Sequence, residues 1–190
     1  MNAPDRQAWP GIRLADLLAR PATAAAADDL NRFLFARIIA SQANGIGCLP
    51  ADLGLGTDGY RRLIDEYFPG FAGGAPGRPV DELPEWSDLH KLLIDHAAGK
   101  RPSEPWIAEM VATACAGRDH LWQDLGLAAR DELSALMRMN FPELARANTS
   151  DMKWKKFLYR QFCSRDGIYI CPAPSCGECR DYTKCFGPEN

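Results

Sequence analysis

The chain has 190 residues, of which 46% are hydrophobic and 25% are charged, and its formal net charge at pH 7 is −3. This length suits one domain with a sizeable core, and the composition is ordinary for a globular protein. The negative net charge argues against a protein that binds nucleic acid or a membrane across its whole surface. No stretch reaches the ~18 consecutive apolar residues that a membrane-spanning helix needs.

Residues 1–11 lack the apolar segment of a secretory signal and include Asp5. We therefore expect a cytoplasmic protein, in a compartment where disulfides are rare. The chain has seven cysteines, and four of them fall between residues 171 and 185. In a reducing compartment, thiols clustered in this way indicate metal ligands before they indicate crosslinks.

Apolar residues at helical spacing recur between Ile12 and Phe162, and no β-strand alternation competes with them. They predict, in chain order, helices around 14–18, 30–38, 57–67, 86–97, 103–115, 133–137 and 150–162, with a short turn at 119–125. Ser103 and Ser150 are expected to cap two of these helices. The predicted fold is therefore all-α, a compact multi-helix domain followed by an irregular C-terminal metal-binding loop rich in cysteine.

This pattern divides the chain into a helical domain, residues 1–165, and a cysteine-rich metal-cluster tail, residues 166–190. Inside the helical domain, eight of the sixteen residues from 69 to 84 are Gly or Pro, which predicts a loop or internal linker. Residues 151–165 contain five basic residues and one acidic residue, Asp151, so a segment with local positive charge precedes the tail.

The tail holds a C-x4-C-x2-C-x5-C motif made of Cys171, Cys176, Cys179 and Cys185. Pro172, Pro174 and Gly177 disfavour a helix there and allow the backbone to fold sharply inward. Ionised thiols held in one short loop repel one another, and a bound metal removes that repulsion. The tail has few large apolar residues, so metal binding would supply its ordering energy.

The spacing favours an iron–sulfur cluster over zinc, with unmetallated or redox-paired thiols as a third possibility. Structural zinc usually takes two close Cys pairs, whereas only Cys176 and Cys179 form such a pair here. The C-x4-C-x2-C portion has the spacing of plant-type iron–sulfur proteins, although their fourth ligand lies far downstream.

Four stretches then resemble the NifQ family of nitrogen fixation: Asp119–Leu127 (DHLWQDLGL), Asn140–Leu144 (NFPEL), Met152–Phe157 (MKWKKF) and Cys185–Gly187 (CFG). The likeness covers about the C-terminal half, from Cys115 to Gly187. It implies a molybdenum–iron–sulfur protein that donates molybdenum to biosynthesis of the nitrogenase iron–molybdenum cofactor. The implied cluster ligands are the four tail cysteines. The implied partners are the nitrogenase iron protein NifH, the scaffold complex NifEN and a molybdenum source such as molybdate.

Two further residues are candidates for an additional ligand, each beside a structural alternative. Cys163 precedes Cys171 by eight residues, but a cysteine that follows Phe162 is more often a small core residue. His120 begins a short helix in the strongest family-like stretch, where its imidazole could bind metal, stabilise an oxyanion or hold the local turn.

The remaining candidates favour structural interpretations. Cys115 lies on the apolar stripe of its helix and is expected in the core. His90 and His96 flank apolar residues of an amphipathic helix and are expected to be structural. Cys48 has no partner at ligand spacing, and no role is assigned to it.

The basic residues Lys153, Lys155 and Lys156 have two interpretations. They could offset the charge of a thiolate cluster or attract molybdate, or they could form a solvated helix face. No P-loop, dinucleotide-binding, serine-hydrolase or zinc-protease motif is found, so the prediction is a metallocluster carrier and no enzyme. The alternative function is a helical interaction module with a structural zinc site in its C-terminal loop, contacting nucleic acid through the basic segment.

Overall fold

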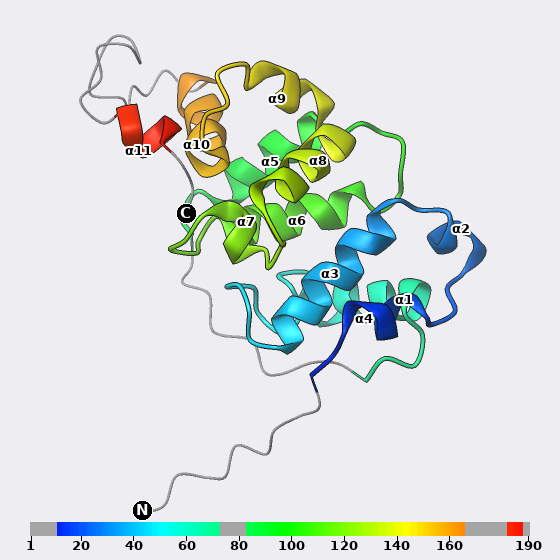
Figure 1. The fold of residues 1–190 in the computed structure, drawn as a ribbon. Coiled ribbons are helices and arrows are strands. Elements are labelled where there is room, and N and C mark those ends of the chain that lie inside the picture. The colour runs from blue at the N-terminus through cyan, green and yellow to red at the C-terminus, as the bar shows by residue number, and fades with distance from the viewer. Residues whose placement is uncertain (1–10, 73–82, 166–181, 188–190) are drawn as a thin grey trace, which may run out of the picture.

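The computed structural model describes residues 11–72, 83–165 and 182–187 (Figure 1). Within these ranges the secondary structure is helical and includes no strand, which confirms the predicted all-α class. The helices are α1 (Leu14–Leu18), α2 (Ala24–Ala27), α3 (Asn31–Ala43), α4 (Gly56–Tyr67), α5 (Trp86–Asp95), α6 (Glu104–Ala114), α7 (Leu121–Asp124), α8 (Arg130–Asn140), α9 (Pro142–Ala147), α10 (Trp154–Arg165) and α11 (Tyr182–Phe186).

Helix α6 lies at the centre of the core. Eight of its eleven residues are buried, including Ile107, Met110 and Val111, which are inaccessible to solvent. Pro105 stands in its first turn, where a missing N–H costs little. Helix α5 packs along α6, and α10 in turn packs against α5. Helices α1 and α3 form a second contact on the far side of the body (Figure 1).

A buried polar network joins α3, α6 and α8. Asn31 Nδ2 donates to Asn140 Oδ1 (2.7 Å) and to Ser103 Oγ (2.8 Å), and Asn140 Nδ2 donates back to Asn31 Oδ1 (3.0 Å). Ser103 and the Tyr67 hydroxyl both donate to the Asp29 carboxylate. These polar groups are buried but hydrogen-bonded, so the network costs little and fixes how the helices meet.

Two predicted caps are wrong for a physical reason. Ser103 does stand at the N-cap position of α6, but its hydroxyl does not cap the helix because it is committed to Asp29. Helix α10 begins at Trp154, four residues after Ser150, so Ser150 is not its cap. At Ser103 a tertiary hydrogen bond thus outweighs the local capping preference.

The last helix, α11, folds back onto the helical body. The Lys153 N–H donates to the Cys185 carbonyl at 2.8 Å, and Cys185 and Phe186 pack half-buried against the core. Figure 1 shows α11 beside α10. Sequence analysis expected an irregular tail and did not anticipate this helix. The end of the tail is therefore attached to the start of the basic helix.

The Gly/Pro-rich stretch 69–84 begins where predicted, directly after α4, although residues 73–82 lie outside the described part. Arg20 anchors its first residues, since the Arg20 guanidinium donates to the Pro69 carbonyl and lies over the Phe71 ring. None of the helices in the described ranges is long and apolar enough to cross a membrane.

Candidate metal-donor site

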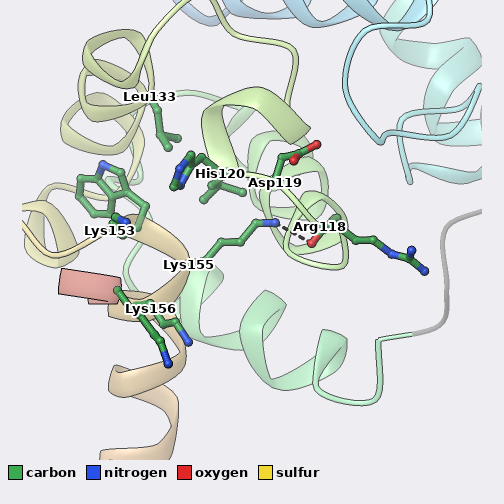
Figure 2. Close-up of a pocket in the computed structure, with 11 residues that line it drawn as sticks. Arg118, Asp119, His120, Leu133, Lys153, Lys155 and Lys156 are labelled. Carbon is green, nitrogen blue, oxygen red and sulfur yellow. Dashed lines mark hydrogen bonds between the residues drawn. The ribbon is translucent and has the colours of Figure 1, made fainter. Parts of the chain in front are cut away.

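A pocket of about 240 Å³ opens where the start of α10, the loop before α7 and α11 come together (Figure 2). Five of its eleven lining residues are lysine or arginine, one is a carboxylate, and three are apolar. The lining residues are Gly117, Arg118, Asp119, His120, Leu121, Leu133, Lys153, Trp154, Lys155, Lys156 and Lys184.

Asp124, the last residue of α7, does not line this pocket but contacts residues that do. Its side chain is 3% exposed and forms an ion pair with the Lys155 ammonium group. Asp124 Oδ2 also accepts a hydrogen bond from the Asp119 N–H at 3.1 Å, and Lys155 Nζ donates to the Gly117 carbonyl at 2.8 Å. A methyl group on Gly117 would come within 2.2 Å of the Asp124 carboxyl carbon, so this close approach requires glycine.

His120 lies at the N-cap position of α7 and also lines the pocket. Its N–H donates to Gln123 Oε1 at 3.1 Å, which secures the turn predicted at 119–125. Figure 2 shows the imidazole on the side of the loop that faces Leu133 and the start of α10. The backbone of His120 thus has the local structural role, while its ring lies on a pocket wall.

The three lysines at the start of α10 occupy different environments. Lys155 is 17% exposed and held by Asp124, whereas Lys153 is half-buried and Lys156 is exposed. Figure 2 shows Lys155 extending from α10 to the Gly117 loop, with Arg118 and Asp119 directed away from α10. Lys155 is therefore not part of a solvated face, whereas Lys156 is exposed, and all three lysines line one pocket.

Of the four motif cysteines, Cys185 lies in the described part, and Cys171, Cys176 and Cys179 lie outside it. Cys185 belongs to α11, whose neighbour Lys184 lines the pocket. Cys163 belongs to α10, but its side chain is outside the described part, so its role as ligand or core residue stays a prediction.

Cys115 and Cys48, two of the three cysteines of the helical body, are poor metal ligands. Cys115 is 5% exposed, as expected for a core residue, and burial raises the pKa of its thiol to about 12. Cys48 is half-buried, its Sγ donates to the Ala114 carbonyl at 3.8 Å, and burial together with Asp124 raises its pKa to about 12. Both remain protonated at neutral pH, whereas metal binding requires thiolate.

His90 and His96 have the structural roles that the sequence predicts. The His90 ring stacks on Trp86 with ring centroids 4.8 Å apart, and burial lowers the pKa of His90. His96 Nδ1 lies 2.8 Å from the Leu92 carbonyl, one helical turn earlier. Within the described residues, no group of three or more His, Cys, Asp or Glu side chains is arranged to hold a metal ion.

Comparison with known proteins decides the family. The NifQ sequence profile matches residues 34–187, most of the chain. This chain belongs to the NifQ family. It is 43% identical to protein NifQ of Azotobacter vinelandii over 177 residues, which cover 85% of this chain and 91% of that protein. It is 35% identical to protein NifQ of Rhodobacter capsulatus, covering 83% of this chain and 88% of that protein.

A third relative is the NifQ homolog of Sinorhizobium fredii, which is 34% identical over 96% of this chain and 83% of that protein. No solved structure matches the chain significantly. The similarity reaches further towards the N-terminus than the sequence alone indicated, since the profile begins at residue 34 rather than near Cys115.

Membership in the NifQ family confirms the predicted function, molybdenum donation in biosynthesis of the iron–molybdenum cofactor. It also confirms a carrier of a molybdenum-related metal group rather than an enzyme. Sequence reasoning singled out His120 and the α10 lysines but missed the pocket contributions of Arg118 and Lys184 and the role of Asp124. The sequence signal for Asp124 is Gly117, whose missing side chain leaves room for the carboxylate.

Proposed function

We propose that this NifQ chain carries its molybdenum in a molybdenum–iron–sulfur cluster bound by Cys171, Cys176, Cys179 and Cys185. The observation that carries the proposal is the C-x4-C-x2-C-x5-C motif in a NifQ chain whose last motif cysteine is tethered to the start of α10. The recipients are the nitrogenase iron protein NifH and the scaffold NifEN.

The chemistry of the donor set supports a cluster. Thiolates are soft ligands that suit iron and thiophilic metals, and wrapping three or four of them around an inorganic core matches the motif better than one small tetrahedral ion. A cluster bound by thiolates is negatively charged. Lys153 donates its backbone N–H to the Cys185 carbonyl, and Lys184 directly precedes Cys185 in the chain. The positive charges of these two lysines would offset part of the cluster's negative charge.

The two parts of the chain have different roles in this proposal. Residues 1–165 form the helical body, with the Gly/Pro-rich loop 69–84 inside it, and residues 166–190 form the cluster tail. A reducing compartment such as the cytosol keeps the four thiols available as ligands. The protonated Cys48 and Cys115 stay outside the ligand set.

The alternative, a structural zinc loop on an interaction module, receives less support. A single C-x2-C pair is a weak zinc pattern. The lysines that would contact nucleic acid converge on a pocket, and Lys155 is engaged with Asp124. Binding to DNA or RNA that falls steeply with salt would favour this alternative.

Replacing single cysteines tests the ligand set. In chain reconstituted anaerobically with iron, sulfide and molybdate, Cys179→Ser should abolish cluster absorbance while helical content by circular dichroism stays nearly intact. The same test applied to Cys163→Ser decides whether Cys163 adds a ligand. Cys48→Ser is the matched control and should load like the wild type.

Transfer is measured by incubating the loaded chain with NifH and NifEN and following molybdenum into NifEN. Full cluster loading in Cys179→Ser, or an equal loss in Cys48→Ser, would contradict the proposed ligands. Loss of helical structure in Cys179→Ser would show instead that the metal supports the whole fold.

A further inference from the structure

The pocket at the start of α10 gathers positive charge from segments that lie far apart in the sequence. Lys153 and Lys156 come from the start of α10, Lys184 comes from α11, and Arg118 comes from the loop before α7. Asp119 is the one lining carboxylate, and Figure 2 shows the side chains of Asp119 and Arg118 both directed away from α10, so the lysines dominate the charge near that helix. A fold that brings these cations together creates a local positive potential in a chain whose net charge is negative.

The position of the lysines on α10 adds to this potential. The N-terminus of a helix carries a partial positive charge, which favours acidic side chains in the first turn. The first turn of α10 has no acidic residue and contains Lys155 and Lys156. Cations at this end of a helix repel the helix dipole, and a bound anion would remove the repulsion.

One of these cations is already neutralised within the protein. Lys155 pairs with the buried Asp124 and donates to the Gly117 carbonyl, so its ammonium group is held in place. Lys153, Lys156 and Lys184 also line the pocket, and they come from two segments joined by the Lys153–Cys185 hydrogen bond.

The size of the pocket limits what it can hold. A volume of about 240 Å³ is below the roughly 300–1,000 Å³ of pockets that enclose drug-sized molecules and cofactors. It is sufficient for one small tetrahedral oxyanion with some of its water. Trp154, Leu121 and Leu133 supply an apolar wall, which lowers the local dielectric and strengthens charge attraction. The Trp154 indole is fixed by a 3.1 Å hydrogen bond to Ser134.

We propose that this pocket binds molybdate, held by Lys153, Lys156 and Lys184 beside Cys185. Molybdate is a tetrahedral dianion at neutral pH, which matches both the charge and the size of the pocket. The proposal rests on the proposed function, since it places the incoming molybdenum beside α11, the helix that carries the last cysteine of the cluster tail. It concerns binding of the oxyanion alone and involves no change in the oxidation state of molybdenum.

Equilibrium dialysis of the metal-free full-length chain against molybdate tests the pocket. Lys153→Gln/Lys156→Gln should weaken molybdate binding at least tenfold, because two charge-assisted hydrogen bonds are lost. Lys153→Arg/Lys156→Arg should retain most of the binding. The matched control is Lys91→Gln/Lys100→Gln, which removes the same charge from exposed positions outside the pocket lining and should bind like the wild type.

Phosphate and sulfate, used as competitors, separate the possible oxyanions. Molybdate should bind more tightly than either, and a site that prefers phosphate or sulfate would overturn the assignment to molybdate. The proposed site would be overturned if the wild type binds no molybdate. It would also be overturned if Lys153→Gln/Lys156→Gln, folded like the wild type by circular dichroism, binds molybdate equally well.

A chain with all four motif cysteines changed to Ser separates this inference from the proposed cluster. Molybdate should still bind to that chain, since the pocket cations remain. If the wild type assembles the cluster but binds no molybdate, the pocket inference fails and the cluster proposal stands. If molybdate binds to the pocket but no cluster forms, the cluster proposal fails instead.

Discussion

Asp124 shows how one buried carboxylate organises the pocket. It accepts from the Asp119 N–H, pairs with the Lys155 ammonium group, and lies so close to Gly117 that a side chain there has no space. The carboxylate thereby ties α7, the preceding loop and the first turn of α10 together. A buried charge of this kind is tolerated because its partner and hydrogen bonds remain in place.

Replacing this carboxylate should be costly. Asp124→Asn leaves the Lys155 ammonium group buried without its counter-charge, and we expect a loss of about 3 kcal/mol in unfolding free energy. Urea denaturation measures the difference. The control Arg61→Gln breaks an exposed pair, with side chains 66% and 82% exposed, and should cost about 0.5 kcal/mol or less. Equal effects of the two substitutions would contradict the structural role of Asp124.

The thiols of Cys48 and Cys115 should be unreactive in the folded protein. Their pKa values of about 12 lie above the ordinary value of 9.0, so only on the order of one in ten thousand is thiolate at pH 8. Alkylation by iodoacetamide should be slow for both and should accelerate in urea, where their pKa values return to the ordinary range. Mass spectrometry identifies the modified residue, and rapid native labelling of Cys115 would contradict its burial.

At the scale of elements, the junction of α10 and α11 connects the tail to the body. The Lys153–Cys185 hydrogen bond fixes the start of α10 against α11, and the Gly187 N–H donates to the Thr183 carbonyl at 2.8 Å to end α11. A Cβ on Gly187 would approach that carbonyl oxygen to 2.4 Å, so the turn after α11 requires glycine.

Gly187→Ala should therefore displace α11 and reduce cluster loading, since Cys185 would lose its fixed position. We expect the helical content of the body to remain unchanged, because α11 has only five residues. Thr183→Ala is the control, as it removes an exposed side chain but keeps the carbonyl oxygen. Loading of Gly187→Ala equal to that of the wild type would show that the docking of α11 is unimportant for the cluster.

The sequence predicted the longer helices because their apolar residues repeat at helical spacing, as Leu89 and Leu93 do in α5 and Ile107 and Val111 do in α6. It missed α2, α9 and α11, which have four, six and five residues, because helices this short rarely contain a full repeat. The cap assigned to Ser103 failed since its hydroxyl bonds to Asp29, 74 residues away, and local rules cannot detect that contact.

At the scale of the whole molecule, the motif cysteines could be predicted because spacing within one short segment carries the information. The pocket could not, because the loop at Arg118, Lys153 and Lys184 come to line one pocket only when the chain folds. Its separate charges are visible in the sequence, as is the basic segment before the tail. Their convergence depends on α10 packing against α5 and on α11 folding back onto α10.

The helical body has the means to fold without metal. Its core spans α1 to α10, and its buried Asn31–Asn140 pair joins helices distant in the chain. Under the proposed function, the metal group belongs to the tail and the body serves as its scaffold. A donor benefits from this arrangement, because releasing the metal does not require the body to unfold.

Metal analysis of the chain purified under strictly anaerobic conditions tests the central claim most directly. A molybdenum–iron–sulfur cluster on the four tail cysteines predicts iron, acid-labile sulfide and molybdenum together in the wild type. The same analysis of Cys179→Ser should find these elements lost. Stoichiometric zinc in the wild type, with no iron, sulfide or molybdenum, would contradict the account.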